Sequence, residues 1–222
     1  MNENDGTGQH AGHRHRPPSR GRQSRRGSPC CRAHGRGAGL GLLGAALLLG
    51  ILYGVRSDLR QLLQQPLFWM KVSFPLAALL AGQVAAARLA RPGMRIGLGP
   101  ATALLLPPAV LWLAGGSWLA LAPPSQRLEL LLGSSWEVCS LNVALLSLPT
   151  LATMLWFLRG FAPTRLRAAG AVAGLVAGAQ GVLVYTLYCV EMAPPFWGVW
   201  YVLGVLLPTL AGAWCGPWLL RW

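Results

Sequence analysis

The sequence contains few charged residues. Only 11% of its 222 residues are Asp, Glu, Lys or Arg, less than half of the roughly 25% found in soluble domains. Acidic residues are the rarest, at 6, while 54% of the chain is hydrophobic. This composition excludes an ordinary soluble domain and is typical of a membrane protein.

Several patterns that carry chemistry are also missing. No segment shows the alternating apolar and polar residues of a membrane β-strand, and no Cys-x-x-Cys pair suits a membrane thiol oxidoreductase. Ionisable residues are nearly absent from the middle of the apolar stretches, where pumps and ion-coupled transporters hold theirs. We therefore expect neither an enzyme nor a cofactor.

Six apolar stretches are long enough to cross a bilayer, which takes about 20 mostly apolar residues for a helix. Backbone groups inside a bilayer must find their hydrogen bonds within the protein, so a chain without barrel patterning spans as helices. The sequence therefore predicts an all-α fold, a polytopic membrane helical bundle. Its six transmembrane helices are expected at about 37–55, 68–90, 97–121, 138–158, 168–190 and 199–220.

The basic residues outside the apolar stretches predict the orientation of the bundle, because cytoplasmic loops are enriched in Lys and Arg. Of the 19 basic residues, 15 fall on one side. They are the eight arginines from Arg14 to Arg36, then Arg88, Arg91, Arg95, Arg159, Arg165, Arg167 and Arg221. The other side has only Arg56, Arg60, Lys71 and Arg127. We expect both termini to be cytoplasmic.

The first 36 residues differ from the rest of the chain. They are rich in Gly, Arg, Ser, Pro and His and almost free of apolar side chains, which predicts a disordered basic cytoplasmic tail at 1–36 and a transmembrane domain at 37–222. The arginines would be attracted to anionic lipid head groups. No aromatic residues alternate with them to stack on bases, so we expect no direct nucleic-acid binding.

Small and polar residues inside the stretches allow two interpretations. Gly170, Gly174 and Gly178 form a stripe on one helix face, which predicts close packing of a neighbouring helix more readily than dimerisation. Gln83, Asn142 and Gln180 are uncharged, and we expect hydrogen bonds between helices. The alternative function, a small membrane transporter or permease subunit, would need these three to line a polar cavity. Lys71, near a helix end, can extend toward the membrane surface.

Two cysteines occupy matching positions on the side opposite the basic loops. Cys139 begins one apolar stretch and Cys189 closes the next, so an antiparallel helix pair would bring both to the same face of the bilayer. Thiols on the oxidising side of a membrane can form a disulfide or respond to metals. Cys139, Cys189 and Glu191 are weak candidates for metal ligands. Cys215 is expected to pack as a small apolar residue.

The order of short motifs around these cysteines resembles a known family. Gly133-Ser-Ser-Trp-Glu-Val-Cys139 is followed by Pro149, Ala162-Pro163 and the glycine stripe. Then come Tyr185-x-x-x-Cys189-x-Glu191, Pro195-Phe196, Trp200-Tyr201 and Gly216-Pro217-Trp-Leu-Leu-Arg221-Trp222. Arg56-x-Asp58-Leu59 and Arg91-Pro92-Gly93 match earlier family features. The sequence resembles the NrsF family, six-helix inner-membrane anti-sigma factors of Gram-negative bacteria, most clearly over 133–222.

The resemblance implies a mechanism. Such a protein would hold an extracytoplasmic-function sigma factor at the cytoplasmic face of the inner membrane, away from core RNA polymerase, and release it under redox or heavy-metal stress. The paired cysteines of the family map onto Cys139 and Cys189. The basic loop residues are candidates for contact with the sigma factor, namely Arg88, Arg91, Arg95, Arg159, Arg165 and Arg167.

The sequence departs from the family pattern at two places. Family members begin with a short acidic and aliphatic segment, whereas residues 1–36 here are basic. A histidine often precedes the second cysteine in the family, and here the residue is Tyr188. The first departure leaves the sigma-binding surface open, and the second favours disulfide chemistry over a thiol–imidazole metal site. The sequence does not determine the oligomeric state.

Overall fold

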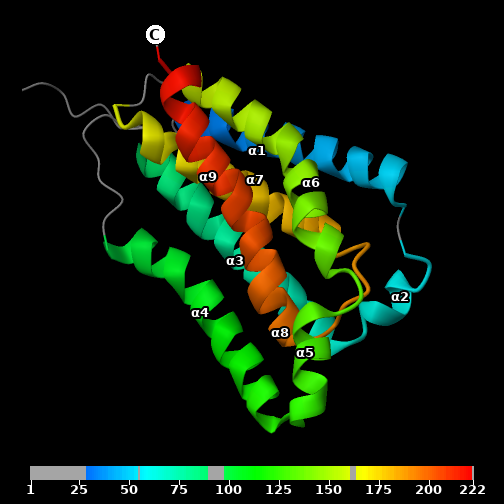
Figure 1. Ribbon diagram of the computed structural model, residues 1–222. Coiled ribbons are helices and arrows are strands. Elements are labelled where there is room, and N and C mark those ends of the chain that lie inside the picture. Colours follow the sequence, from blue (N-terminus) through cyan, green and yellow to red (C-terminus); the bar gives the residue numbers. More distant parts are fainter. Residues whose placement is uncertain (1–28, 55, 90–97, 161–163, 222) are drawn as a thin grey trace, which may run out of the picture.

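The computed structural model describes residues 29–54, 56–89, 98–160 and 164–221. These residues form helices joined by turns, with no strand among them, as Figure 1 shows. Six helical segments are long and apolar enough to cross a membrane. The predicted class, an all-α bundle with six potential transmembrane helices, is confirmed.

The long helices are α1 (Pro29–Leu52), α3 (Pro66–Leu89), α4 (Leu98–Leu121), α6 (Trp136–Arg159), α7 (Leu166–Tyr185) and α9 (Val202–Leu219). Shorter elements connect them: α2 (Leu59–Leu62), α5 (Pro124–Leu132), α8 (Pro194–Phe196) and a π-helical turn, η1 (Trp197–Tyr201). The elements α8, η1 and α9 form one continuous apolar segment, Pro194–Leu219.

Two helix boundaries differ from the expected ones. α1 begins at Pro29, so residues 29–36, which we expected in the tail, are helical. α7 ends at Tyr185, five residues before the expected limit at 190. The next segment, Thr186–Ala193, begins with a turn and contains no helix. Residues 1–28 lie outside the described part of the chain, and their predicted disorder stays a prediction.

The central element of the bundle is α7. Of its 20 residues 14 are buried, and it packs against α9, α6, α3 and α1, which surround it in Figure 1. By contrast α4 lies at the edge of the bundle, and only 11% of its apolar stretch Ala101–Leu121 is buried within the protein. Its large exposed side chains are apolar, for example Leu105, Leu113 and Leu121.

The glycine stripe of α7 faces α9. A β-carbon placed on Gly170 would lie 2.1 Å from the carbonyl oxygen of Gly212, and one on Gly178 would lie 2.8 Å from the Cα of Val205. Only a residue without a side chain permits this approach. The predicted close packing of a neighbouring helix is confirmed, and the stripe is used within the chain.

Antiparallel packing gives the bundle two chemically different ends. At one end Ala38, Leu158, Ala169 and Leu220 form a cluster from α1, α6, α7 and the residue after α9. Exposed arginines flank this cluster, namely Arg36, Arg159, Arg165, Arg167 and Arg221. We call this the basic end. The opposite end, which carries Asp58, Glu129, Glu137 and Glu191, contains Cys139 and Cys189, and we call it the thiol end.

Candidate functional site

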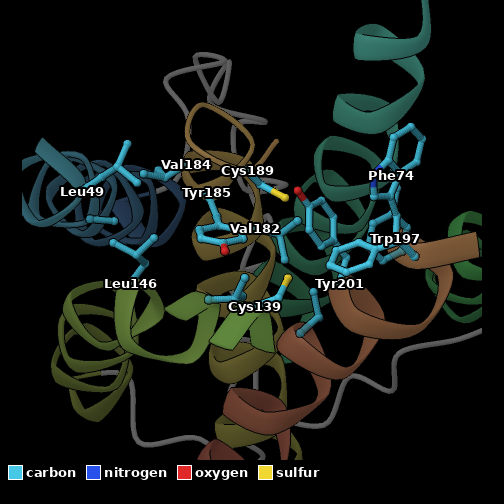
Figure 2. Packing of buried hydrophobic residues seen from close by; sticks show 14 of the residues in the cluster. Leu49, Phe74, Cys139, Leu146, Val182, Val184, Tyr185, Cys189, Trp197 and Tyr201 are labelled. Carbon is cyan, nitrogen blue, oxygen red and sulfur yellow. The ribbon is translucent and has the colours of Figure 1, made fainter. Parts of the chain in front are cut away.

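The structure brings the two cysteines together, as the antiparallel pairing of α6 and α7 predicted. Cys139 lies in the first turn of α6 and is fully buried, while Cys189 lies beyond the end of α7 and is 3% exposed. Both belong to one hydrophobic cluster, and the ionisation of one thiol is coupled to that of the other. Figure 2 shows the two sulfur atoms within this cluster. Both are free thiols.

Aromatic rings enclose the thiol pair. Tyr185 and Tyr201 lie with their ring centroids 6.3 Å apart, and Phe196 lies 6.5 Å from Tyr201. The hydroxyl of Tyr201 is buried without a regular hydrogen bond and lies against Cys189, next to it in Figure 2. These rings keep bulk water from the sulfur atoms. A reagent therefore reaches the thiols only if it is small or if the surrounding side chains and backbone move aside.

The cover is the non-helical segment Thr186–Ala193. Its backbone carbonyls point toward cations on other elements: Lys71 Nζ donates 2.8 Å hydrogen bonds to the carbonyl oxygens of both Cys189 and Glu191. The Trp197 indole N–H also donates to the Glu191 carbonyl, at 3.0 Å. Hydrogen bonds therefore join the cover to α3, through Lys71, and to the π-helical turn η1, through Trp197.

A second cation fastens the cover from the α1–α2 connection. Gly54, two residues beyond the end of α1, has a φ of +74°, a conformation that favours glycine. Arg56 donates from its backbone to the Leu187 carbonyl at 3.5 Å and from Nη1 to the Cys189 carbonyl at 3.4 Å. Its guanidinium is held by Asp58, with Nε 2.8 Å from Oδ1.

Glu191 is directed away from the thiols. Its carboxylate accepts hydrogen bonds from the backbone N–H and the hydroxyl of Ser134, at 2.7 and 2.6 Å. Gly133 has a positive φ of +59°, and its lack of a side chain leaves room for this carboxylate, because a β-carbon there would lie 2.7 Å from Glu191 Cδ. Within the described ranges no group of three His, Cys, Asp or Glu residues could hold a metal ion. The structure therefore does not place Glu191 with the cysteines as a ligand, and a metal response of the pair alone stays a prediction.

Neighbouring groups lower the pKa values of two acidic groups at the site, the Asp58 carboxyl and the Cys189 thiol. The Arg56 hydrogen bond lowers the pKa of Asp58 below its usual range. Cys189 lies beyond the helical spans, and a hydrogen bond from the Cys139 thiol lowers the pKa of its sulfur. Burial opposes this shift, and the charge of Lys71 adds to it. The neighbouring Cys139 thiol and the Lys71 charge thus favour the thiolate form of Cys189.

Four of the six candidate partner-binding arginines lie within the described residues, and all four are at the basic end. Arg159, Arg165 and Arg167 are exposed there, and Arg88 is half-buried in the last turn of α3. Arg91 and Arg95 lie outside the described residues. The length of α7 separates this end from the thiols, a distance of about 30 Å for its 20 residues.

The polar residues proposed to line a transporter cavity include two that bond between helices. Asn142 Oδ1 accepts a 2.8 Å hydrogen bond from the Tyr53 hydroxyl, and Gln180 Nε2 donates to the Ala38 carbonyl at 3.1 Å. Gln83 is half-buried on α3. Asn142 and Gln180 thus join helices, as expected.

Sequence reasoning missed Lys71, Trp197 and Tyr201. We expected Lys71 to extend to the membrane surface, yet it is 1% exposed and its ammonium lies 5.6 Å from the Tyr201 ring centroid. That expectation was wrong, because two carbonyls within the bundle offer the ammonium better partners. One signal was available: Lys71 is the only lysine in the chain and falls inside an apolar stretch, where an ionisable residue marks a functional site by default.

Comparison with known proteins identifies relatives over most of the chain. A family model described as "Negative regulator of sigma F", NrsF, matches residues 19–222. The chain is 44% identical over 185 residues to the probable anti-sigma-F factor NrsF of Azospira oryzae, covering 83% of this chain and 86% of that protein. It is 41% identical over 190 residues to the anti-sigma-F factor NrsF of Caulobacter vibrioides, with the same coverage. No solved structure matches the chain.

Proposed function

This chain belongs to the NrsF family of negative regulators of sigma F, and from that premise we propose that it is a membrane anti-sigma factor controlled by its thiol pair. In the inactive state of the pathway it binds an extracytoplasmic-function sigma factor at the cytoplasmic face of the inner membrane. Redox or heavy-metal stress changes the state of Cys139 and Cys189 and releases the sigma factor. The burial of these two thiols against each other, at the end opposite the exposed arginines, carries the proposal.

The basic end is the surface we assign to the sigma factor. Its exposed arginines satisfy the positive-inside rule if this end faces the cytoplasm, where a sigma factor is found. Arg159, Arg165 and Arg167 present three positive charges around a single connection. Charges at the rim of an interface raise the association rate of a partner with the opposite charge.

The thiol end is the surface we assign to the signal. In the oxidative case the Cys189 thiolate and the Cys139 thiol form one S–S bond, releasing the remaining proton and giving two electrons to a two-electron oxidant. In the heavy-metal case both sulfur atoms lose their protons and bind one soft metal ion. Either product alters the spacing between the start of α6 and Thr186–Ala193.

Helices connect the two ends directly. α6 carries Cys139 in its first turn and Arg159 in its last, while α3 carries Lys71 near one end and Arg88 near the other. A change in the thiol pair can favour one packing of these helices over another. It then changes the fraction of molecules whose basic end is in the conformation that binds the sigma factor. No contact between the sigma factor and the thiols is required.

The proposal is tested in cells. Deleting the protein should raise transcription from promoters of the partner sigma factor, and unchanged transcription would defeat the regulatory proposal. Cys139→Ser and Cys189→Ser should each abolish induction by oxidants or heavy metals while repression persists. Cys215→Ser on α9 is the matched control and should respond as the wild type does. Full induction in both serine variants would defeat the sensor assignment alone.

A further inference from the structure

Lys71 is a buried cation next to the thiol pair. It is 1% exposed, and its ammonium donates to the Cys189 and Glu191 carbonyls at 2.8 Å each. The rings of Trp197 and Tyr201 face it, with centroids 5.9 and 5.6 Å away. Its position at the Cys189 carbonyl places the ammonium beside the residue that carries the thiol, and the charge of the ammonium acts on that thiol. The hydrogen bonds and ring contacts of the ammonium are thus made with Thr186–Ala193 and the rings around the thiol pair.

No carboxylate balances this charge in the part of the chain that the structure describes. The ion pair recorded there joins Arg56 to Asp58, and the Glu191 carboxylate is bound by Ser134. A buried ammonium facing only carbonyl dipoles and rings pays a desolvation penalty that an anion would offset. The Cys189 thiol, on the residue whose carbonyl binds the ammonium, can supply such a negative charge when it ionises.

We propose that Lys71 is the positioning and charge-balancing residue of the thiol pair. Its ammonium fixes Cys189 through the two carbonyls and stabilises the thiolate of that cysteine, whose proton passes to solvent. Because the thiolate is the form that attacks oxidants and binds metals, Lys71 sets the pH range in which the pair reacts. This inference deepens the proposed function by naming the residue that makes the sensor reactive.

The other groups around Cys189 do not replace Lys71. The Cys139 thiol is neutral when protonated and brings no positive charge to the Cys189 sulfur. Tyr185 and Tyr201 contribute neutral hydroxyls at ordinary pH. Arg56, the second cation, is already paired with Asp58 and contacts the Cys189 carbonyl at 3.4 Å. Lys71 therefore supplies the unpaired charge.

The test follows the alkylation of Cys189 in the purified full-length protein in lipid nanodiscs. The rate of reaction with iodoacetamide is measured by peptide mass spectrometry across the range from about pH 5 to about pH 10, which brackets the ordinary cysteine pKa. Lys71→Met should move the midpoint of the Cys189 profile upward by about one pH unit or more, slowing alkylation about tenfold at neutral pH. Lys71→Arg should restore most of the rate. Cys215 in the same molecules is the internal control and should not change.

Two results would overturn the inference. One is a Lys71→Met profile that superimposes on the wild type; the other is an equal shift in Lys71→Met and Lys71→Arg, which would assign Lys71 to packing alone. If Lys71→Met does not fold, the wild type decides: its ultraviolet thiolate absorbance should rise in a step below the ordinary cysteine pKa, and Cys189→Ser should lack that step. Absence of the step in the wild type would equally refute the inference. No sigma factor is present, so the outcome is independent of the test in cells.

Discussion

Gly174 of α7 and Pro208 of α9 touch through their backbones. A β-carbon built on Gly174 would lie 2.0 Å from the Pro208 carbonyl oxygen and 2.7 Å from the Cα of Thr209. Both obstacles are main-chain atoms, so no rotamer change can relieve the contact. The central helix of the bundle is thus joined to α9 at a distance that one methyl group would alter.

Gly174→Ala is therefore expected to destabilise the protein strongly. The added methyl must push α7 and α9 apart, at a cost of about 3 kcal/mol or more. Gly50→Ala on α1 is the matched control, because a β-carbon there meets nothing within 4 Å. Thermal melting in detergent should show a large fall for Gly174→Ala and none for Gly50→Ala. Equal melting temperatures for the two variants would contradict this packing.

Mild oxidation should join Cys139 to Cys189 within one chain. Treating the protein in nanodiscs with diamide and digesting it without reduction should yield a linked peptide containing both residues. Cys215, on the half of α9 near the basic end, should be absent from that product. Cys189→Ser should remove the linked peptide and Cys215→Ser should leave it intact. A product that links either cysteine to a second chain would instead indicate a sensor shared between protomers.

Acid should loosen the attachment made by Arg56. Because the pKa of folded Asp58 is lowered, its contribution to stability is complete above the ordinary aspartate range and is lost as pH falls through the folded-state pKa. Asp58→Asn should remove this part of the acid-side decrease in melting temperature and lower stability slightly at neutral pH. Glu137→Gln, at an exposed position on the same end, should keep the decrease. If the melting temperature falls equally with decreasing pH in the wild type and in Asp58→Asn, the Arg56–Asp58 pair does not contribute to the acid sensitivity.

The six apolar helices were predictable because a helix that crosses a bilayer needs about 20 mostly apolar residues, and such stretches are visible in the sequence. The end of α7 was not predictable in this way. Residues 186–190 are apolar or uncharged, and hydropathy does not distinguish a helix from an extended segment that is buried by other elements. The pair Cys139 and Cys189 could be placed together because consecutive membrane helices are antiparallel.

The burial of Lys71 could not be read from its neighbours in the sequence. Whether a lysine near a helix end extends to the surface depends on what the fold offers inside, and its acceptors come from residues 118 and 120 positions later. The same holds for Arg56, whose contact with Cys189 spans 133 positions. These contacts depend on the three-dimensional packing that closes the segment Thr186–Ala193 over the thiols.

The thiol end is expected to face the periplasm. In a variant with all native cysteines replaced by serine, Glu137→Cys should react with a membrane-impermeant maleimide in intact cells, and Thr164→Cys should react only after lysis. Both positions are exposed and lie at opposite ends of α6 or just beyond it. A C-terminal green fluorescent protein fusion should fluoresce, while alkaline phosphatase at the same site should be inactive. The reverse labelling pattern would invert the proposed orientation.

Charge reversal at the basic end should weaken binding of the sigma factor. Arg165→Glu and Arg167→Glu together change two exposed positive charges into negative ones without touching buried contacts. We expect affinity to fall about tenfold at low salt, with a smaller difference at high salt, because exposed charges are screened. Co-purification from membranes at two salt concentrations measures the effect. Arg127→Glu, exposed near the thiol end, is the matched control: an equal loss there would show that net charge matters and that the basic end has no special role. Loss restricted to the Arg165 and Arg167 pair would place the sigma factor one helix length from the thiols, so that the signal must pass through the packing of the bundle.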